Sequence, residues 1–373
     1  MKIIEKVRKE DKLKILTVVG ARPQFIKAAV VSLELRKLNT EILVHTGQHF
    51  DYNMSKQFFE ELNIPDPDYN LGISGGSHGQ MTGKMLIEIE KVLIKEQPDW
   101  LLVYGDTNST LAAALAAAKL HIPICHVESG TRTHSMTNPE EINRICTDHV
   151  SSMLLACTEN DIKELEREGL SENAQLVGDP MYDAFIKYTG RLSQKEINLI
   201  LLDGCRSDVP ERFYYLTCHR EENTGIEKLT QICKAMEQLP YPVIYPVHPR
   251  NRKQVKYIQE KERFKNIIFT EPIGYLESIC LVNYAEKIIT DSGGLQREAF
   301  FAGKQCVTVL NHVTWQATMV DRRNQLARPD CDDILDKLSK EQEINESYKP
   351  FGDGHAAKYI AKALKGEIKG GMA

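Results

Sequence analysis

The chain has 373 residues, of which 42% are hydrophobic and 27% are charged. This composition is typical of a globular protein, and at about 150 residues per domain the length favours two domains. The 52 Asp and Glu residues outnumber the 47 Lys and Arg residues, which leaves a formal charge of −5 with no long block of one sign. This balance argues against nucleic acid or an anionic membrane as the main partner, because both require a basic surface.

The N-terminal residues and the cysteines indicate the compartment. Residues 1–14, MKIIEKVRKEDKLK, mix acidic with basic residues and contain no apolar core, so they do not resemble a secretory signal. The sequence has no run of about 20 apolar residues, the length that crosses a membrane. Its nine cysteines include no CxxC pair and no Cys/His cluster with zinc spacing. We therefore expect a cytoplasmic protein with reduced thiols and no metal site.

Short apolar segments rich in Val, Ile and Leu alternate with longer segments through the first half of the chain. Apolar runs of about four to eight residues are typical of strands buried on both faces, and the spacing leaves room for crossover helices. In chain order, we predict helices at Pro23–Lys37 and Thr110–Leu120, and strands at Leu13–Val19, Glu41–Thr46, Trp100–Tyr104, Ile122–Val127 and Ser152–Cys157. The first half is thus predicted to form a parallel α/β sheet.

The second half repeats this alternation. We predict a helix at Gly225–Gln238 and strands at Phe213–Thr217, Val243–Val247, Ile267–Thr270, Lys287–Thr290 and Gln305–Leu310. The duplication favours an α/β fold with two doubly wound domains, residues 1–185 and 186–352, whose strand ends line a cleft. Residues 178–203 contain no clear sheet strand and are the expected crossing from one domain to the other.

Polar residues follow several predicted strands of the first domain, where a doubly wound sheet presents side chains to a ligand. In chain order they are Arg22, Lys27, Gln48, His49, Asp106, Glu128, Arg132, Glu140, Glu141 and Arg144. The acidic members have structural alternatives. Asp106 suits a helix cap, and Glu140 and Glu141 suit the first turn of a helix because of its dipole. Glu128 ends an apolar strand, where a carboxylate requires a partner, with Arg132 and Arg144 as candidates, or a function.

The second domain carries a candidate phosphate site. Thr290-Asp-Ser-Gly-Gly294 lies between a buried strand and a helix, where small residues allow backbone N–H groups to face an anion. Two basic pairs, His219-Arg220 and His248-Pro-Arg250, follow neighbouring strands, and Glu298 lies on the helix after the turn. Glu298 either accepts hydrogen bonds from a ribose or is a surface residue paired with Arg297 or Lys304. The sequence contains neither GxGxxG nor GxxxxGK[ST], which argues against nicotinamide, flavin or ATP chemistry, so we expect no cofactor.

These motifs together resemble the UDP-N-acetylglucosamine 2-epimerase family from about Leu13 to Lys365. The matching segments are Gly20-Ala-Arg-Pro with Lys27, Thr46-Gly-Gln-His49, Tyr104-Gly-Asp-Thr107, His126-Val-Glu128 with Arg132, Pro139-Glu-Glu-Ile-Asn-Arg144, Cys218-His-Arg-Glu-Glu-Asn223 and Asp291-Ser-Gly-Gly-Leu-Gln-Arg-Glu298. The resemblance implies two Rossmann-like domains in a glycosyltransferase-B-like fold, a homodimer, and a C-terminal helix in residues 353–373 that packs on the first domain. The sequence departs from the family at Val313-Thr-Trp-Gln-Ala317, where glutamates are common.

The same resemblance implies a reaction and its residues. Because the C2 proton of a UDP-2-acetamido sugar has no adjacent carbonyl, elimination of UDP to a glycal and its return to C1 is the expected route to inversion. That scheme requires carboxylates near C2 and cations around the departing diphosphate. The expected catalytic residues are Asp106, Glu128, Glu140 and His219. The expected substrate-binding residues are Arg22, Lys27, Gln48, His49, Arg144, His248, Ser292, Gly293, Gly294 and Glu298.

Several related activities fit the same residues. The segments at Ala21–Lys27, Gly47–Met54 and His78–Gly83 look nearer to the subgroup acting on UDP-2,3-diacetamido-2,3-dideoxyglucuronate than to plain epimerases. A hydrolysing 2-epimerase shares the elimination step, and a glycosyltransferase of the same architecture would use the same phosphate site. A glycosyltransferase requires one base rather than three acids, which favours the epimerase. A non-catalytic nucleotide-sugar sensor is the remaining alternative.

Overall fold

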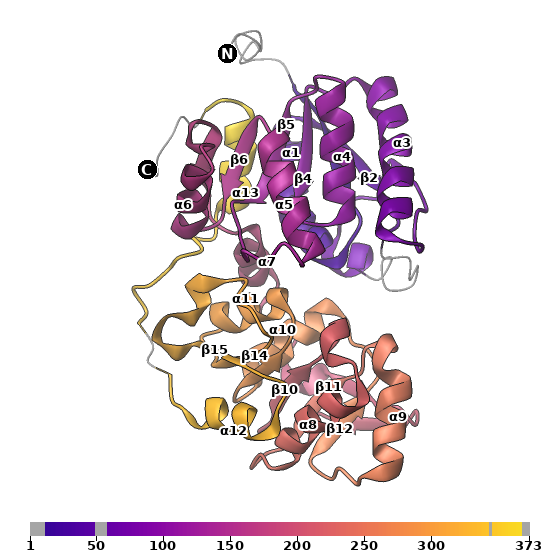
Figure 1. Cartoon of the computed structure of the whole chain (residues 1–373), viewed down its shortest axis with the longest axis vertical. Helices are drawn as coiled ribbons and strands as arrows, with labels where there is room; N and C mark the ends of the chain where they lie inside the picture. Colours follow the sequence, from indigo (N-terminus) through magenta and orange to yellow (C-terminus); the bar gives the residue numbers. More distant parts are fainter. Residues whose placement is uncertain (1–11, 49–57, 343–344, 368–373) are drawn as a thin grey trace. The chain divides into compact units, whose positions relative to one another are not determined.

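The computed structural model describes residues 12–48, 58–342 and 345–367. The chain divides into two compact units (Figure 1). Unit 1 comprises the residues through Ala184 and those from Lys349 onward, and unit 2 comprises Phe185–Tyr348. Within the described ranges, no helix combines the length and apolar character that crossing a membrane requires.

Unit 1 is built on a parallel seven-stranded sheet with the order β3-β2-β1-β4-β5-β6-β7. The strands are β1 (Lys14–Val19), β2 (Thr40–His45), β3 (Tyr69–Asn70), β4 (Trp100–Tyr104), β5 (Ile124–Ser129), β6 (Met153–Ala156) and β7 (Ala174–Leu176). The order reverses at β1 and β4, which are neighbours. In a doubly wound sheet, ligands bind at the carboxyl ends of the strands at this reversal.

The helices of unit 1 are α1 (Arg22–Leu38), α3 (His78–Glu96), α4 (Asn108–Lys119), α5 (Pro139–Val150), α6 (Glu159–Arg167), α7 (Pro180–Tyr188, which continues into unit 2) and α13 (Ala356–Leu364). Helix α4 lies between α3 and α5 (Figure 1). Its alanines, such as Ala113 and Ala117, are fully buried, so α4 packs closely against the sheet. Together with β1, β2 and β4 they form one apolar core.

The C-terminal helix α13 belongs to unit 1 and contacts α1. The Asp183 carboxylate on α7 accepts hydrogen bonds from the backbone N–H groups of Ala356 (3.1 Å) and Ala357 (2.8 Å). A carboxylate at a helix N-terminus satisfies N–H groups that have no partner within the helix. Asp183 therefore fixes the start of α13 after the chain returns from unit 2.

Unit 2 repeats the same plan with a parallel six-stranded sheet of order β12-β11-β10-β13-β14-β15. The strands are β10 (Tyr214–Thr217), β11 (Val243–Pro246), β12 (Ile267–Thr270), β13 (Ile288–Thr290), β14 (Cys306–Val309) and β15 (Asn324–Ala327), and the helices are α8 (Ile226–Glu237), α9 (Arg252–Lys261), α10 (Tyr275–Tyr284), α11 (Gly293–Phe301) and α12 (Cys331–Ser339). Here the order reverses at β10 and β13. A separate antiparallel pair is formed by β8 (Asn198–Ile200) and β9 (Arg206–Asp208).

Each predicted strand is present with its ends within two residues of the prediction, and the predicted α/β class with doubly wound sheets is confirmed. The expectation that residues 178–203 contain no strand is wrong, because β8 lies there. The short strands β3, β7 and β15 were not predicted, since they have two to four residues and include polar ones. Such strands lack the apolar run that identifies a buried strand.

Candidate active site

The carboxyl ends of β1, β4 and β5 in unit 1 gather most of the predicted polar residues. The turn after β1 is tightly packed: a Cβ on Gly20 would lie 2.2 Å from the hydroxyl oxygens of Ser109 and Thr46. The buried Gln24 side chain accepts hydrogen bonds from the Gly20 and Ala21 N–H groups and donates to the Tyr104 carbonyl at 2.9 Å. Gln24 therefore joins the turn after β1 to the end of β4.

Glu128 leaves β5 with an unusual backbone. Its φ is +69°, and the pairing register of β5 with β6 shifts between Val127 and Ser129. A bulge of this kind turns a side chain away from its regular direction, and a left-handed non-glycine residue costs about 1–3 kcal/mol. The Glu128 side chain contacts the Lys27 ammonium of α1, which is 2% exposed. The surrounding fold thus holds a buried carboxylate next to a buried cation.

Lys27 was not among the predicted partners of Glu128. Arg132 instead pairs with Asp148 (2.7 Å) and Glu168 (2.7 Å), and Arg144 pairs with Asp106 and Glu141. The prediction that Arg132 or Arg144 serves as the counter-ion of Glu128 is therefore replaced by the pair with Lys27. One sequence feature could have indicated this pair: Lys27 is a charged residue in a stretch of α1 whose other residues are buried.

Asp106 is half-buried and forms an ion pair with Arg144 of α5. The alternative that Asp106 caps the next helix is wrong, because Thr107 is the cap and its hydroxyl accepts the Thr110 N–H. The Asp106 carbonyl accepts a hydrogen bond of 2.8 Å from Asn143. Burial alone would lower the pKa of Arg144, but Asp106 and Glu141 raise it, so the guanidinium stays charged beside Asp106.

The two glutamates at the start of α5 differ in their surroundings. Glu141 is 1% exposed and accepts the backbone N–H groups of Thr133 and His134 (2.8–2.9 Å), which fixes the preceding loop. Burial raises the pKa of Glu141, but these N–H groups and Arg144 outweigh it and lower the pKa. Glu140 is half-buried, and its own N–H donates to the Asn138 cap. Glu141 is thus structural, which leaves Glu140 as the candidate with an accessible carboxylate.

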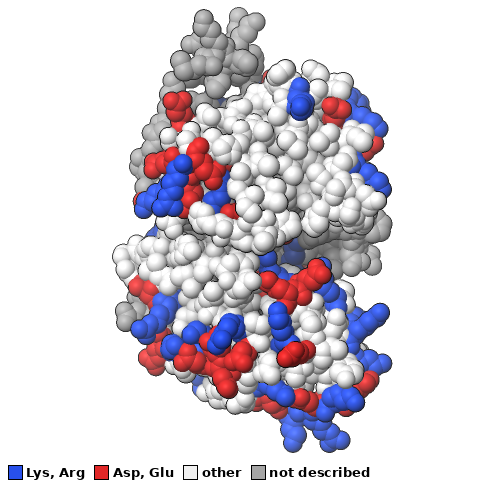
Figure 2. All heavy atoms as spheres, viewed as in Figure 1, with Lys and Arg blue, Asp and Glu red and all other residues white. Residues whose placement is uncertain are grey.

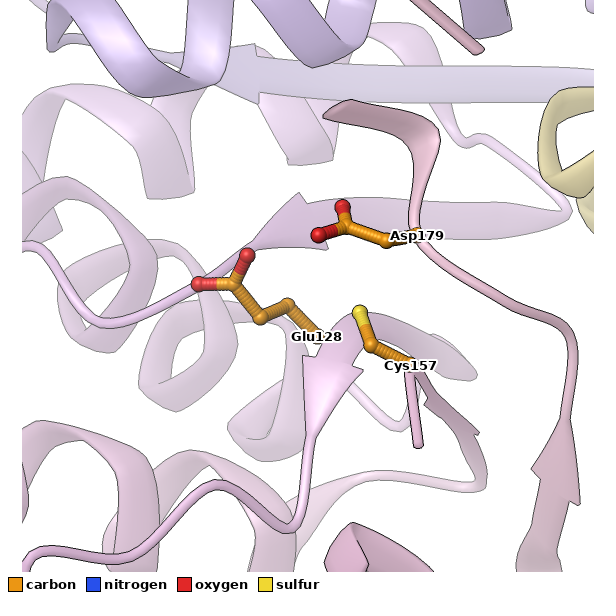
Figure 3. A group of neighbouring side chains, drawn as sticks. All are labelled: Glu128, Cys157 and Asp179. Atoms are coloured by element: carbon orange, nitrogen blue, oxygen red, sulfur yellow. The ribbon is translucent and has the colours of Figure 1, made fainter. Parts of the chain in front are cut away.

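A second group of buried side chains surrounds Glu128. Ligand atoms of Glu128, Cys157 and Asp179 all lie within 4.8 Å of one another, and Figure 3 shows the three side chains pointing toward a common space. Sulfur and carboxylate oxygens are suitable ligands for a divalent metal ion. The Lys27 ammonium already contacts Glu128, so its positive charge would oppose a metal ion at this group. Asp179 also accepts the Met181 N–H at 2.8 Å at the start of α7.

The remaining first-domain candidates lie close to the same strand ends. Gln48 accepts hydrogen bonds from the N–H (3.1 Å) and hydroxyl (2.7 Å) of Ser109, so its amide is tied to α4. Arg22 begins α1, with its guanidinium carbon 4.7 Å from the ring centre of Phe58. His49 lies outside the described residues.

In unit 2, Ser292, Gly293 and Gly294 form the turn from β13 into α11. The Ser292 hydroxyl accepts the Leu295 N–H at 3.4 Å, and Gly293 begins the helix. The first N–H groups of a helix have no partner within it, so this end suits an anion. A Cβ on Gly293 would lie 3.4 Å from the indole nitrogen of Trp315, so the divergent Val313–Ala317 segment packs directly against this turn.

His219 and Asp291 follow β10 and β13, the two strands at the reversal of unit 2. Asp291 accepts the backbone N–H groups of His219 and Arg220 (2.9–3.0 Å), and the His219 Nδ1 lies 3.1 Å from the Asp291 carboxylate. Burial raises the pKa of Asp291, but these contacts lower it to about 2. The carboxylate holds Nδ1, which directs the other nitrogen of a 41%-exposed ring outward. His248 lies beside it, with 5.6 Å between the ring centres.

Glu298 lies on α11 and is 5% exposed. The alternative that it is a surface residue is therefore wrong. Its neighbour Arg297 packs over the Trp315 ring at 3.9 Å. A buried carboxylate on the helix that begins at the phosphate turn fits a hydrogen-bond acceptor for a bound ligand.

Comparisons with known proteins agree with this arrangement. The sequence model of the UDP-N-acetylglucosamine 2-epimerase family matches residues 32–365. A UDP-N-acetylglucosamine 2-epimerase homologue of Methanococcus maripaludis is 46% identical, over 95% of this chain and 99% of the relative. The UDP-2,3-diacetamido-2,3-dideoxy-D-glucuronate 2-epimerase of Pseudomonas aeruginosa is also 46% identical, over 94% and 99%.

A solved structure of the Methanocaldococcus jannaschii UDP-GlcNAc 2-epimerase in complex with UDP-GlcNAc and UDP is similar to this chain, with a TM-score of 0.84. The two sequences are 37% identical, and the similarity covers 94% of this chain and 99% of that one. The match of the family model and the near full-length relatives agree with each other. The chain belongs to the UDP-N-acetylglucosamine 2-epimerase family, a family of isomerases.

Proposed function

We propose that this enzyme inverts C2 of a UDP-2-acetamido sugar by eliminating UDP and adding it back. The observation that carries the proposal is the pair of carboxylates at the reversal of unit 1, Asp106 and Glu128, each beside its own cation. A neighbouring cation favours the charged form of a carboxylate. An ionised carboxylate can remove a proton, and in its protonated form it can return one.

The reaction balances without an external oxidant or reductant. A carboxylate removes the C2 proton, the C–H electron pair forms the C1=C2 bond, and the C1–O bond breaks with its electron pair on UDP. In the return step a protonated carboxyl delivers a proton to the opposite face of C2, and a UDP oxygen bonds to C1 again. The protein must therefore supply acids on both faces of C2 and charge stabilisation for the leaving diphosphate.

We assign the proton transfers to Asp106, Glu128 and Glu140. Lys27 forms an ion pair with Glu128, and Arg144 forms one with Asp106. We therefore propose that Lys27 is the counter-ion of Glu128 and does not bind the diphosphate. Arg22 and Gln48, at the ends of β1 and β2, are left to position the sugar nucleotide.

We assign UDP to unit 2. The Ser292–Gly294 turn supplies N–H donors at the start of α11, and His219 and His248 supply donors for the departing diphosphate. Glu298 is the acceptor for the ribose hydroxyls. Asp291 supports this role indirectly, because it fixes Nδ1 of His219.

The test is incubation with UDP-N-acetylglucosamine in heavy water, followed by proton NMR. The proposal predicts deuterium at C2 and formation of the manno epimer as a UDP sugar. Release of free sugar and UDP would indicate a hydrolysing 2-epimerase. Transfer to an added acceptor without C2 exchange would indicate a glycosyltransferase, and UDP-sugar binding without any turnover would indicate a sensor.

A parallel incubation with UDP-2,3-diacetamido-2,3-dideoxyglucuronate addresses the substrate. Relatives named for each substrate match this chain at 46% identity or slightly less, so both are substrates to compare. The expected outcome is a clear difference in kcat/KM between the two. Equal values would indicate that the sugar site does not distinguish a 3-acetamido uronate from a plain hexose.

We also propose a homodimer that works in the cytoplasm. The surface over α4 and α5 carries few charged side chains (Figure 2), and Ile142 on α5 is 40% exposed. An uncharged, partly apolar surface supports association. The nine cysteines are all unpaired, which supports a reducing compartment. Light scattering during gel filtration is the test, and a mass of one chain would contradict the dimer.

A further inference from the structure

Two buried side chains, His126 and Asp148, connect the segments that carry the three proposed acids. Both are 0% exposed. His126 Nδ1 lies 2.6 Å from the Asp148 carboxylate on α5, and His126 Nε2 lies 2.7 Å from the Gly105 carbonyl oxygen. His126 belongs to β5, so one imidazole joins the ends of β4 and β5 to the body of α5.

The contacts define which atoms carry protons. A carbonyl oxygen only accepts, so Nε2 of His126 must donate to Gly105. The second Asp148 oxygen accepts from Arg132 (2.7 Å) and from the Gly130 N–H (3.1 Å), which identifies Asp148 as an ionised carboxylate. Burial would raise the pKa of Asp148, but His126 and Arg132 lower it. Nδ1 of His126 therefore donates as well, and the ring is a buried imidazolium.

Asp148 reaches each acid-bearing segment by a short path. Through His126 it holds the carbonyl of Gly105, the residue before Asp106. Through the Gly130 N–H it holds the loop that follows the bulge at Glu128, and it lies on the same helix as Glu140. The position of Gly105 matters for Glu128 too, because its φ is +59° and a Cβ there would lie 3.3 Å from a Glu128 carboxylate oxygen.

The charges around the imidazolium are balanced. Asp148 on α5 faces it directly, and Arg132 faces the same carboxylate from the loop after β5. Glu168, after α6, neutralises Arg132 at 2.7 Å. The Lys27–Glu128 pair, from α1 and β5, lies next to Gly105. The Arg144–Asp106 pair joins α5 to the residue that follows Gly105.

We propose that His126 and Asp148 are positioning residues. They hold Asp106, Glu128 and Glu140 at the relative positions that proton transfer requires. This inference rests on the proposed 2-epimerase function. Proton transfer depends steeply on the distance between the acid and the carbon, and a misplacement of about 1 Å can cost about 100-fold in rate. Both residues are fully buried, so their effect on the three acids is transmitted through Gly105 and Gly130.

The first test is His126→Gln. A glutamine amide has one NH2 group, so it can donate toward Gly105 or Asp148 while its own oxygen faces the other acceptor. We expect kcat for C2 inversion to fall about 100-fold while KM changes by less than about threefold, since UDP binding is assigned to unit 2. A kcat within about threefold of wild type would overturn the proposal.

Asp148→Asn gives a second readout that does not require a large loss of packing. The asparagine amide can donate to Nδ1 of a neutral His126 while its oxygen still accepts from Arg132 and Gly130. We expect kcat to fall about tenfold, less than in His126→Gln because the amide keeps a hydrogen bond to the ring, while KM changes by less than about threefold. A kcat within about threefold of wild type would overturn the proposal.

Glu168→Gln is the matched control. It removes a carboxylate from the same network, on the same Arg132, without touching His126, Gly105 or Gly130. We expect kcat within about threefold of wild type. An effect equal to that of Asp148→Asn would show a merely electrostatic or structural role and overturn the proposal. If wild type itself shows no C2 exchange with either UDP sugar, the proposed function fails, and this role fails with it.

Discussion

The two units share one strand order but use its reversal in opposite ways. In unit 1 the strand ends are filled by charged side chains that are buried in ion pairs, such as Lys27 with Glu128 and His126 with Asp148. In unit 2 the equivalent ends carry small residues, helix N–H groups and partly exposed histidines. Proton transfer needs carboxylates whose charge and position are fixed, whereas an anion needs donors that it can reach. The same topology is thus compatible with the two kinds of chemistry that we propose, through different side chains at the strand ends.

The largest effect is expected for Glu128→Gln in unit 1. Removing an acid/base group lowers kcat by about 10²–10⁴-fold, and deuterium incorporation at C2 should fall in parallel. UDP affinity, measured by calorimetry, should stay within about twofold of wild type because the proposed UDP site lies in unit 2. Persistent C2 exchange in this variant would contradict the assignment of proton transfer to unit 1 and UDP binding to unit 2.

The second prediction concerns the pH dependence of unit 1. Burial raises the pKa of Asp161 to about 7, with a further contribution from Glu128, although hydrogen bonds from Thr158 and Thr131 oppose it. A folded-state pKa above the unfolded value of 3.8 means that the folded state loses stability as pH rises from about 4 to 7, by a few kcal/mol. Asp161→Asn should therefore raise the urea midpoint at pH 8 and leave it nearly unchanged at pH 4.

Unit 2 provides the opposite case. The pKa of Asp291 is lowered to about 2, so its contribution of roughly 2 kcal/mol is present above about pH 4 and is lost as pH falls toward 2. Asp291→Asn should thus lower the urea midpoint at pH 7. If both variants shifted the midpoint in the same direction at pH 7 to 8, the contrast between the units would fail.

The third prediction compares Gly20, which follows β1, with Gly293, which begins α11. Gly20→Ala places a Cβ 2.2 Å from the Ser109 and Thr46 hydroxyls, and overpacking of this kind costs about 1–3 kcal/mol of unfolding free energy. Gly293→Ala places its Cβ 3.4 Å from the Trp315 indole and should change stability by less than about 0.5 kcal/mol. Chemical denaturation of both variants is the measurement. Equal losses would show that both turns are packed alike.

The smallest effect is expected for Ser292→Ala. Loss of one hydroxyl donor to a charged phosphate should weaken UDP binding by about tenfold. Ser77→Ala is the control, because Ser77 caps α3 in the same way, with its hydroxyl accepting the Gln80 N–H at 3.3 Å. Both variants lose a helix cap, but only Ser292→Ala should change the UDP affinity measured by calorimetry. A matching change in Ser77→Ala would indicate a general loss of stability.

The sequence was sufficient for the strands and for the turn from β13 into α11, because both are local patterns. Apolar runs predict buried strands, and Thr290-Asp-Ser-Gly-Gly294 is contiguous. The partners of the acids were not predictable in this way. Glu128 pairs with Lys27, which is distant in sequence, and the choice between Lys27, Arg132 and Arg144 depends on where side chains of comparable charge point.

Helix caps show the same limit on a smaller scale. Asp106 and Thr107 are both good cap residues, and they are adjacent. Thr107 becomes the cap in the structure, which leaves the Asp106 carboxylate to Arg144. His126 received no role from the sequence, since a histidine in a buried strand gives no signal of the two acceptors that face it.

The return of α13 to unit 1 has a consequence for the integrity of the polypeptide. Because unit 1 is made of residues on both sides of Phe185–Tyr348, unit 2 is an insertion with two tethers. A protease that cuts one tether leaves the pieces joined through the other, and the tail beyond a cut near residue 345 is still held by Asp183 and α1. Separate expression of either half would thus require redesign of the ends, such as a short linker that replaces the insertion.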